Sequence, residues 1–223
     1  MKKITLSAIA LMAFAFTQAQ DLKFGAKAGL NLANLTGDVE DTSMKPGFHV
    51  GGFVEIKFSD KLALQPELLY SLQGAKTEYN YSFGDMMSES SESKINLSYI
   101  NIPVMLKFYP VEKLFLEAGP QVGFLVSAKS KDEYSITMDG TTTSGSEDVD
   151  VKDSFKSIDF GFNIGAGYEF TENLFANVRY NIGLSNIAEE TEIDVEDIDF
   201  ENLSANDFSV KNSVLSVSIG YKF

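Results

Sequence analysis

The single histidine of the chain, His49, is the side chain best suited to chemistry. A neutral imidazole can take the proton of a serine hydroxyl when a third polar group orients it, as in serine hydrolases. A hydrolase acting on lipid would need His49 close to both a serine and the lipid. If residues 47–58 form a strand, however, alternation turns His49 to the polar, interior side. We therefore expect no enzyme, and keep a lipid-modifying enzyme as the last of three functional alternatives.

Charged side chains form the second candidate, because many fall on the polar side of alternating segments. Buried charges are tolerated when they are paired, so this arrangement predicts a salt-bridge network in the interior. A polar path for a small solute is the alternative. Apart from His49, five acids and seven bases share the polar side. None forms a catalytic, cofactor-binding or metal-binding motif, and we assign no such site. The set is Lys23, Lys27, His49, Glu55, Lys57, Glu67, Lys107, Glu117, Lys129, Asp159, Glu169, Arg179 and Lys222.

The segment 188–210 carries nine acids and no base. Clustered carboxylates are ligands that calcium prefers, but the glycine and the spacing of an EF-hand loop are missing. A solvated loop whose charges repel one another is the interpretation that we favour. The acids are Glu189, Glu190, Glu192, Asp194, Glu196, Asp197, Asp199, Glu201 and Asp207.

Eight segments alternate with the period of a β-strand, and residues 157–170 do so most clearly. Every even position from Ile158 to Phe170 is apolar, whereas no odd position carries a large apolar side chain. A helix would spread these residues around its circumference, so the period of two predicts a strand. The predicted strands are Leu22–Leu32, Gly47–Phe58, Leu62–Gly74, Ile95–Tyr109, Leu114–Lys129, Ser157–Phe170, Leu174–Ile187 and Lys211–Phe223.

Tight turns and long connections alternate between these strands. The turns lie at 59–61, 110–113 and 171–173, and the long connections at 33–46, 75–94, 130–156 and 188–210. Short periplasmic turns and long extracellular loops are typical of outer-membrane barrels, with both termini in the periplasm. The sequence thus predicts an all-β fold, an eight-stranded antiparallel up-and-down transmembrane β-barrel. Its Thr141–Ser146 stretch, polar and containing glycine, predicts a mobile loop tip.

Two irregularities interrupt the pattern. Ile95, Leu97 and Tyr99 alternate out of step with the apolar residues from Ile100 onwards, which a bulge or an extension above the membrane would explain. Three prolines fall inside predicted strands, where each removes a hydrogen-bond donor from the ladder. We therefore expect bulges or local widening at Pro66, Pro103 and Pro120.

The N-terminus predicts a signal peptide over 1–19, followed by one barrel domain over 20–223. Lys2 and Lys3 precede the apolar stretch Ile4–Phe16, and Thr17-Gln18-Ala19 resembles a cleavage site. Cleavage would remove two lysines and no acid, changing the formal charge from -14 to -16. Such acidity argues against nucleic acid as a partner. With no cysteine in the chain, we expect neither disulfides nor thiolate metal sites.

A soluble barrel of the lipocalin type would show the same alternation, with the apolar side facing inwards. The polar side is rich in glycine, asparagine and serine with scattered charges, whereas a solvated sheet carries lysine, glutamate and threonine. Small residues and paired charges suit the narrow lumen of eight strands, which side chains fill. The composition therefore favours the membrane barrel.

Several strand motifs resemble those of the PorT-like outer-membrane β-barrel proteins, over nearly the whole mature chain. They include Gly25-Ala-Lys-Ala-Gly-Leu-Asn-Leu, Leu64-Gln-Pro-Glu-Leu-Leu-Tyr, Tyr99-Ile-Asn-Ile-Pro-Val and Arg179-Tyr-Asn-Ile-Gly-Leu-Ser-Asn-Ile. The resemblance implies an eight-stranded barrel in the outer membrane. The namesake of the family takes part in type IX secretion, so the resemblance also implies a role as a secretion accessory.

The chain ends on Val217-Ser-Ile-Gly-Tyr-Lys-Phe223, which resembles the aromatic signal read by the barrel-assembly machinery. The resemblance implies that this machinery contacts Tyr221 and Phe223. We accordingly expect a structural or protein-interaction role in the outer membrane, for secretion or surface assembly, with membrane lipid and a surface protein as partners. A narrow pore for ions or small solutes is the second alternative.

Overall fold

A computed structural model describes residues 21–39, 41–83, 87–138, 141–189 and 209–223. The predicted signal peptide and most of the acidic segment, 190–208, lie outside the described residues. In the described part, no helix has the length and apolar character needed to cross a membrane. The strands are β1 (Asp21–Gly37), β2 (Thr42–Ser59), β3 (Leu62–Phe83), β4 (Met87–Val111), β5 (Leu114–Met138), β6 (Thr141–Asp150), β7 (Ile158–Glu169), β8 (Leu174–Gly183) and β9 (Val210–Lys222), with a short 3-10 helix η1 (Lys152–Ser154) before β7.

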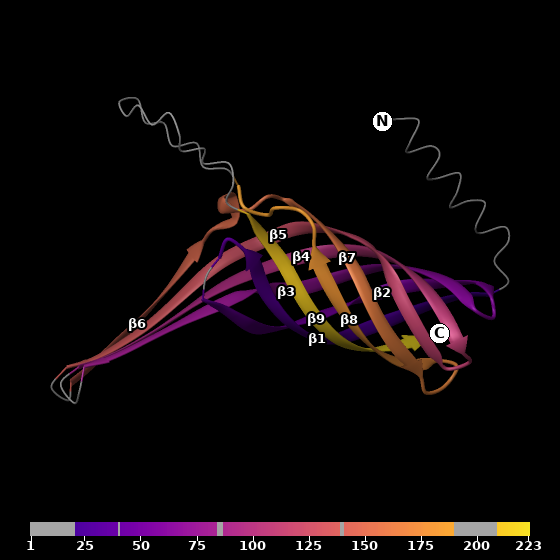
Figure 1. Cartoon of the computed structure of the whole chain (residues 1–223), viewed down its shortest axis with the longest axis horizontal. Coiled ribbons are helices and arrows are strands. Elements are labelled where there is room, and N and C mark those ends of the chain that lie inside the picture. Colours follow the sequence, from indigo (N-terminus) through magenta and orange to yellow (C-terminus); the bar gives the residue numbers. More distant parts are fainter. Residues whose placement is uncertain (1–20, 40, 84–86, 139–140, 190–208) are drawn as a thin grey trace, which may run out of the picture.

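Eight antiparallel strands close into a barrel, as the sequence predicts. The hydrogen-bonded order runs β4-β3-β2-β1-β9-β8-β7-β5, and pairing between β4 and β5 closes the ring. The three tight turns, the start of β1 and the end of β9 lie together at one end of the barrel (Figure 1), which we call the turn end. All eight predicted strands are therefore present, and three tight turns join them where predicted.

The barrel carries its apolar side chains on the outside. In β7, Phe160, Phe162 and Ile164 are exposed, while Asp159 and Asn163 between them are buried. The other strands share this polarity, since the arginine, lysines and glutamates of the lumen are among the most buried residues. Such a surface would be unstable in water and suits a lipid environment. The lipocalin alternative, which requires an apolar interior, is therefore wrong.

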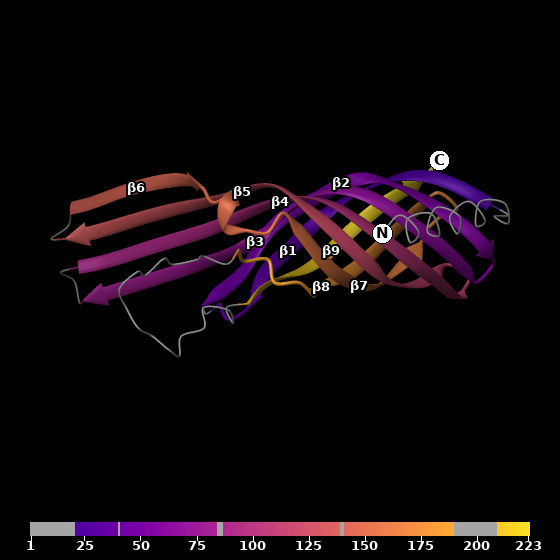
Figure 2. The same ribbon diagram turned by 90° about the horizontal axis from the view of Figure 1, so that it is seen from above.

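Three of the four predicted long connections are mostly strand instead of loop. In the connection 33–46, residues 33–37 belong to β1 and residues 42–46 to β2. Residues 75–83 and 87–94 extend β3 and β4, residues 130–138 extend β5, and β6 pairs with this extension of β5. The result is a four-stranded antiparallel sheet, β3-β4-β5-β6, that continues beyond the barrel (Figures 1 and 2). We call it the projecting sheet. The prediction of a loop tip at 141–146 is wrong, because these residues belong to β6.

A bulge in β5 reverses the phase of that strand, whereas β4 keeps one register with β3 along its whole length. Ser98 of β4 faces Ser127, but the next residue, Tyr99, faces Leu125, so Val126 is an extra residue in β5. Beyond the bulge, Ala128 points inwards and Lys129 is exposed. The prediction that Lys129 faces the lumen is therefore wrong, because one inserted residue reverses the parity of everything above it.

The three strand prolines do not cause bulges. The register between β3 and β4 is the same on both sides of Pro66 and Pro103, and pairing is missing only for the residues between Pro66 and Leu69. Pairing between β4 and β5 is likewise interrupted from Pro103 to Leu106, next to Pro120, without a shift. Each proline lacks a backbone N–H donor, so the ladder of hydrogen bonds opens locally at these positions. This agrees with local widening, and no bulge accompanies it.

Candidate functional site

A central charge cluster holds the middle of the lumen together. Arg179 of β8 donates hydrogen bonds to two carboxylates, those of Glu67 and Glu117. Its Nη1 and Nη2 lie 3.0 and 2.8 Å from the oxygens of Glu67. Its Nε and Nη2 lie 2.8 and 3.0 Å from the oxygens of Glu117. Lys27 adds a contact of 3.2 Å to Glu67. The four charges sum to zero and come from β1, β3, β5 and β8. They therefore tie four parts of the wall together across the lumen.

A second neutral cluster lies nearer the turn end. Lys222 Nζ lies 2.6 Å from both Glu55 and Glu169, and Lys107 Nζ lies 3.0 Å from Glu55. The hydroxyl of Tyr109 donates to Glu169 at 2.8 Å. Two acids are thus matched by two bases. The predicted salt-bridge network is confirmed, and its two halves are each balanced.

Three phenylalanines plug the lumen at the level of the second cluster. Phe53, Phe115 and Phe175 are almost fully buried, and the ring of Phe175 meets the other two at centroid distances of 5.6 and 5.9 Å. Each ring lies over a glycine on the neighbouring strand. Gly220 is directly opposite Phe175, and a Cβ on Gly220 would lie 2.2 Å from the ring, so no other residue fits there. The ammonium of Lys107 lies 4.2 Å from the centre of the Phe115 ring. Phe115 and Phe175 therefore point into the lumen.

An apolar cap closes the opposite end of the lumen, where the projecting sheet begins. It comprises eight buried residues, among which Leu97 and Tyr99 are completely inaccessible. These are the residues that alternate out of step in the sequence, and they face inwards because the interior there is apolar. The cap consists of Leu35, Ala75, Leu97, Tyr99, Leu125, Ala128, Ile187 and Val210.

His49 lies between the central cluster and the cap, in a chain of hydrogen bonds. Its Nδ1 is 2.8 Å from Asn31 Oδ1, and its Nε2 is 2.8 Å from the hydroxyl of Ser218. The amide nitrogen of Asn31 donates to Ser71 and to the carbonyl of Leu72, so the Asn31 oxygen accepts a hydrogen bond from His49 Nδ1. In a neutral imidazole that carries its proton on Nδ1, Nε2 then accepts from the Ser218 hydroxyl. This is the order of a serine triad. Both His49 and Ser218 are buried, however, and the adjoining cavity of about 30 Å³ admits only water. The geometry therefore supports a structural role.

Replacing His49 by leucine tests this role. The change leaves Asn31 Oδ1 and the Ser218 hydroxyl without their partner in a buried site, so we expect the free energy of unfolding to fall by about 1–3 kcal/mol. Urea unfolding of the refolded barrel in detergent micelles measures this. Labelling of Ser218 by a fluorophosphonate in the native barrel would contradict the structural role.

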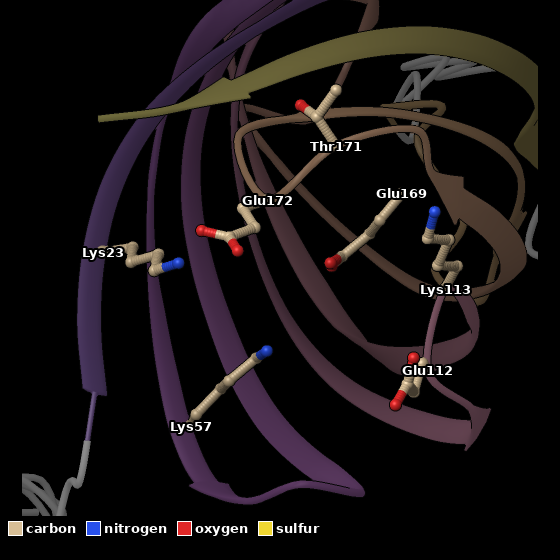
Figure 3. Close-up of a pocket in the computed structure, with 7 residues that line it drawn as sticks. All are labelled: Lys23, Lys57, Glu112, Lys113, Glu169, Thr171 and Glu172. Carbon is tan, nitrogen blue, oxygen red and sulfur yellow. The ribbon is translucent and has the colours of Figure 1, made fainter.

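The turn end opens into a shallow mouth of about 610 Å³. Figure 3 shows the charged side chains around it, with Lys23, Lys57, Glu169 and Glu172 directed towards its centre. The ammonium of Lys57 also lies 5.2 Å from the centre of the Tyr109 ring. Lys23 and Lys57 are therefore on the inner side as predicted, but at the rim instead of inside the network.

The projecting sheet has two unlike faces. The aromatic face continues the inner side of the barrel and carries Tyr79, Tyr81, Tyr134, Ile136 and Met138, of which Tyr79 and Met138 are 57% and 56% exposed. The opposite face continues the lipid side, yet has no apolar residue among its described positions. We call it the charged face; it consists of lysine, glutamate, aspartate, asparagine, serine and threonine. This change from apolar to polar places the sheet outside the lipid.

Rows of lysine and glutamate cross the charged face. Lys76 bonds to Glu78 on the same strand, Lys94 likewise bonds to Glu92, and Lys131 Nζ lies 2.6 Å from Glu133. The hydrogen bond from Lys131 lowers the pKa of Glu133 below its ordinary value. These exposed pairs contribute little to stability individually, but they make this face soluble.

Solved structures of similar proteins include Ail, the attachment invasion locus protein of Yersinia pestis, which is 12% identical over 92% of this chain and 100% of its own, with a TM-score of 0.42. Neisserial surface protein A is 16% identical over the same shares, with a TM-score of 0.46. OprG from Pseudomonas aeruginosa is 11% identical over 90% of this chain and 95% of its own, with a TM-score of 0.32. No curated protein matches the sequence.

Residues 18–189, well over half of the chain, match the family model of the outer membrane protein beta-barrel domain. The chain belongs to this family. Membership implies that the barrel lies in the outer membrane, which agrees with its apolar exterior and closed ring of strands. The charge network is thus the buried interior of a membrane barrel.

Ten of the thirteen predicted inward residues are buried in this outer-membrane barrel, Lys23 and Lys57 line the mouth, and Lys129 is outside.

Of the acidic segment, only Glu189 among its nine acids is described, so the predicted loop is not tested. Elsewhere in the described residues, no cluster of three or more metal-ligating side chains occurs. The projecting sheet was missed, because the serine-rich and charged residues 87–94 and 141–150 resemble loop composition.

Proposed function

We propose that this protein binds another protein through its projecting sheet, while the barrel anchors it in the outer membrane. The observation that carries the proposal is the contrast between the two parts. The lumen is closed by the phenylalanine plug and the apolar cap, with balanced charges between them. The sheet, by contrast, exposes aromatic side chains and unpaired strand edges. An exposed apolar surface on a soluble segment is typical of an interaction site.

The proposal includes an orientation. The projecting sheet faces the outside of the cell, and the tight turns and both termini of the chain face the periplasm. This direction is supported by the short turns at one end, since outer-membrane barrels keep short connections on the periplasmic side. The partner is then a protein at the cell surface. No enzymatic step is part of the proposed role.

Photo-crosslinking in intact cells tests the proposal. A photoreactive residue at Tyr79 or Thr143 of the projecting sheet should give one recurrent protein adduct, identified by mass spectrometry. The same residue at Lys113 or Glu172 on the periplasmic turns serves as the matched control and should not give that adduct. Adducts from the sheet to lipid alone would contradict the proposal, and conductance of the purified barrel above that of a protein-free bilayer would favour the pore.

The resemblance to PorT-like proteins supports a narrower form of the proposal, in which the surface partner belongs to a secretion or surface-assembly system. The C-terminal aromatic pair supports a separate contact during assembly. Tyr221 and Phe223 are 49% and 75% exposed, and their rings meet edge to face at 5.7 Å on the outer wall. We propose that the barrel-assembly machinery binds this pair before β1 and β9 close the ring.

A further inference from the structure

The outer edge of β6 is an open strand edge. Among the described strands β6 pairs only with β5, over all ten residues from Thr141 to Asp150. Its outward N–H and C=O groups therefore lack a strand partner, which makes the edge a template for another strand. From Thr141 to Ser146 the residues are threonine, serine and glycine. No large side chain of this stretch obstructs the edge.

The aromatic face presents an unbalanced acidic pair beside this edge. Asp132 of β5 and Glu147 of β6 lie directly opposite each other across the strand pair, where like charges repel. No lysine or arginine lies on this face within the described part of the projecting sheet. On the other face, Asp148 lies opposite Lys131, and Asp150 lies opposite Lys129. A cation beside Glu147 would relieve the repulsion, whereas one beside Asp148 would meet an existing lysine.

An apolar contact lies one step further along the same face. Tyr134 is paired with Gly145, and its ring lies so close across β6 that a Cβ on Gly145 would be 2.5 Å from the hydroxyl. The ring therefore extends over β6 towards the open edge, and it is 47% exposed. An added strand would place the side chain opposite Gly145 against this ring.

We propose that the edge of β6 binds an extended segment of the partner protein as a fifth strand, antiparallel to β6, with a basic side chain opposite Glu147 and an apolar one opposite Gly145. Backbone hydrogen bonds supply affinity in such strand addition, and alternate side chains supply specificity. Because strands alternate, the basic and apolar residues are two positions apart, with one polar residue between them that faces the charged side. This inference rests on the proposed function and adds the chemistry of the partner.

The binding of a designed peptide to the full barrel in detergent micelles tests the inference. The probe is a fluorescent peptide, Thr-Lys-Thr-Phe-Thr-Val-Thr-Val-Thr, whose lysine and phenylalanine match Glu147 and Gly145 in the antiparallel register. Fluorescence polarisation should show saturable binding. A peptide of the same composition without alternation should bind at least about tenfold more weakly, since it cannot place both side chains on one face.

Charge reversal at two neighbouring residues makes the test specific. Glu147→Lys should lower the affinity of the barrel for the lysine peptide by about tenfold or more. The same variant should bind more tightly a peptide in which glutamate replaces that lysine. Asp148→Lys makes the same change of net charge on the other face and should leave the lysine peptide's affinity almost unchanged. Equal effects of the two substitutions, or equal binding of the peptide without alternation, would overturn the inference.

The two proposals fail separately. If a recurrent surface protein is crosslinked to the sheet in cells but Glu147→Lys and Asp148→Lys act alike on the peptide, the interaction role stands and the β6 edge is wrong. If the peptide binds as expected but no protein adduct forms in cells, the edge can accept a strand and the proposed physiological role is wrong.

Discussion

Replacing Arg179 by leucine should lower the free energy of unfolding by about 3–5 kcal/mol, as expected when one member of a buried ion network is removed. The guanidinium makes four hydrogen bonds to Glu67 and Glu117, and both carboxylates are inaccessible to solvent. Without it, two negative charges remain buried with Lys27 as their nearest cation. Equilibrium urea unfolding in micelles, followed by the shift between folded and unfolded bands on a gel, measures the change.

A compensated variant separates charge from packing. Arg179→Leu combined with Glu117→Gln removes one positive and one negative charge, so that Lys27 and Glu67 remain as a neutral pair at 3.2 Å. We expect this double variant to recover most of the lost stability, because a charge-balanced replacement is far less costly than leaving a buried charge unpaired. A double variant as unstable as Arg179→Leu would show that the arginine acts through its shape and its hydrogen bonds, and not through charge balance.

Much of the barrel could be predicted because lipid imposes one simple rule on each strand. Residues 158–170 alternate without exception, so one strand reveals which side chains face the lumen, and Arg179 and Glu117 follow by the same parity. Which acid meets which base could not be predicted, because the partners lie on strands far apart in sequence. Glu117 and Arg179 are separated by 62 residues, and only the closed ring brings them to 2.8 Å.

The same rule fails above the membrane, for a physical reason. Outside lipid the outer face must be polar, so the alternation of β3 and β4 inverts near the apolar cap, where Leu97 and Tyr99 face inwards. In β5 the extra residue Val126 reverses the parity as well, which moves Lys129 outwards. Serine-rich residues 87–94 have low strand propensity by themselves. They form a strand because β3 and β5 supply hydrogen bonds on both sides.

Replacing Phe175 by alanine should lower the free energy of unfolding by about 3–5 kcal/mol, which is the range for removing a buried phenylalanine from a well-packed core. The ring fills the centre of the plug: it contacts Phe53 and Phe115, covers Gly220, and lies 4.6 Å from the Lys107 ammonium. None of its neighbours can fill the space, because Phe53 and Phe115 are held over their own glycines. Urea unfolding in micelles provides the measurement.

Phe170→Ala is the matched control, since Phe170 is an exposed phenylalanine on the outer wall, near the same end of the barrel. The change removes contacts with detergent and one edge-to-face contact with the exposed ring of Tyr168, and we expect its effect on the free energy of unfolding to be well below that of Phe175→Ala. Gly220→Val approaches the plug from the other side, because its side chain would overlap the Phe175 ring, and overpacking costs about 1–3 kcal/mol. If Phe175→Ala relieves the Gly220→Val defect, so that the double variant is more stable than the sum of the two changes, the ring and the glycine act as one unit. Additive losses would instead mean that the plug is loosely packed and that the charge clusters alone hold the turn end closed.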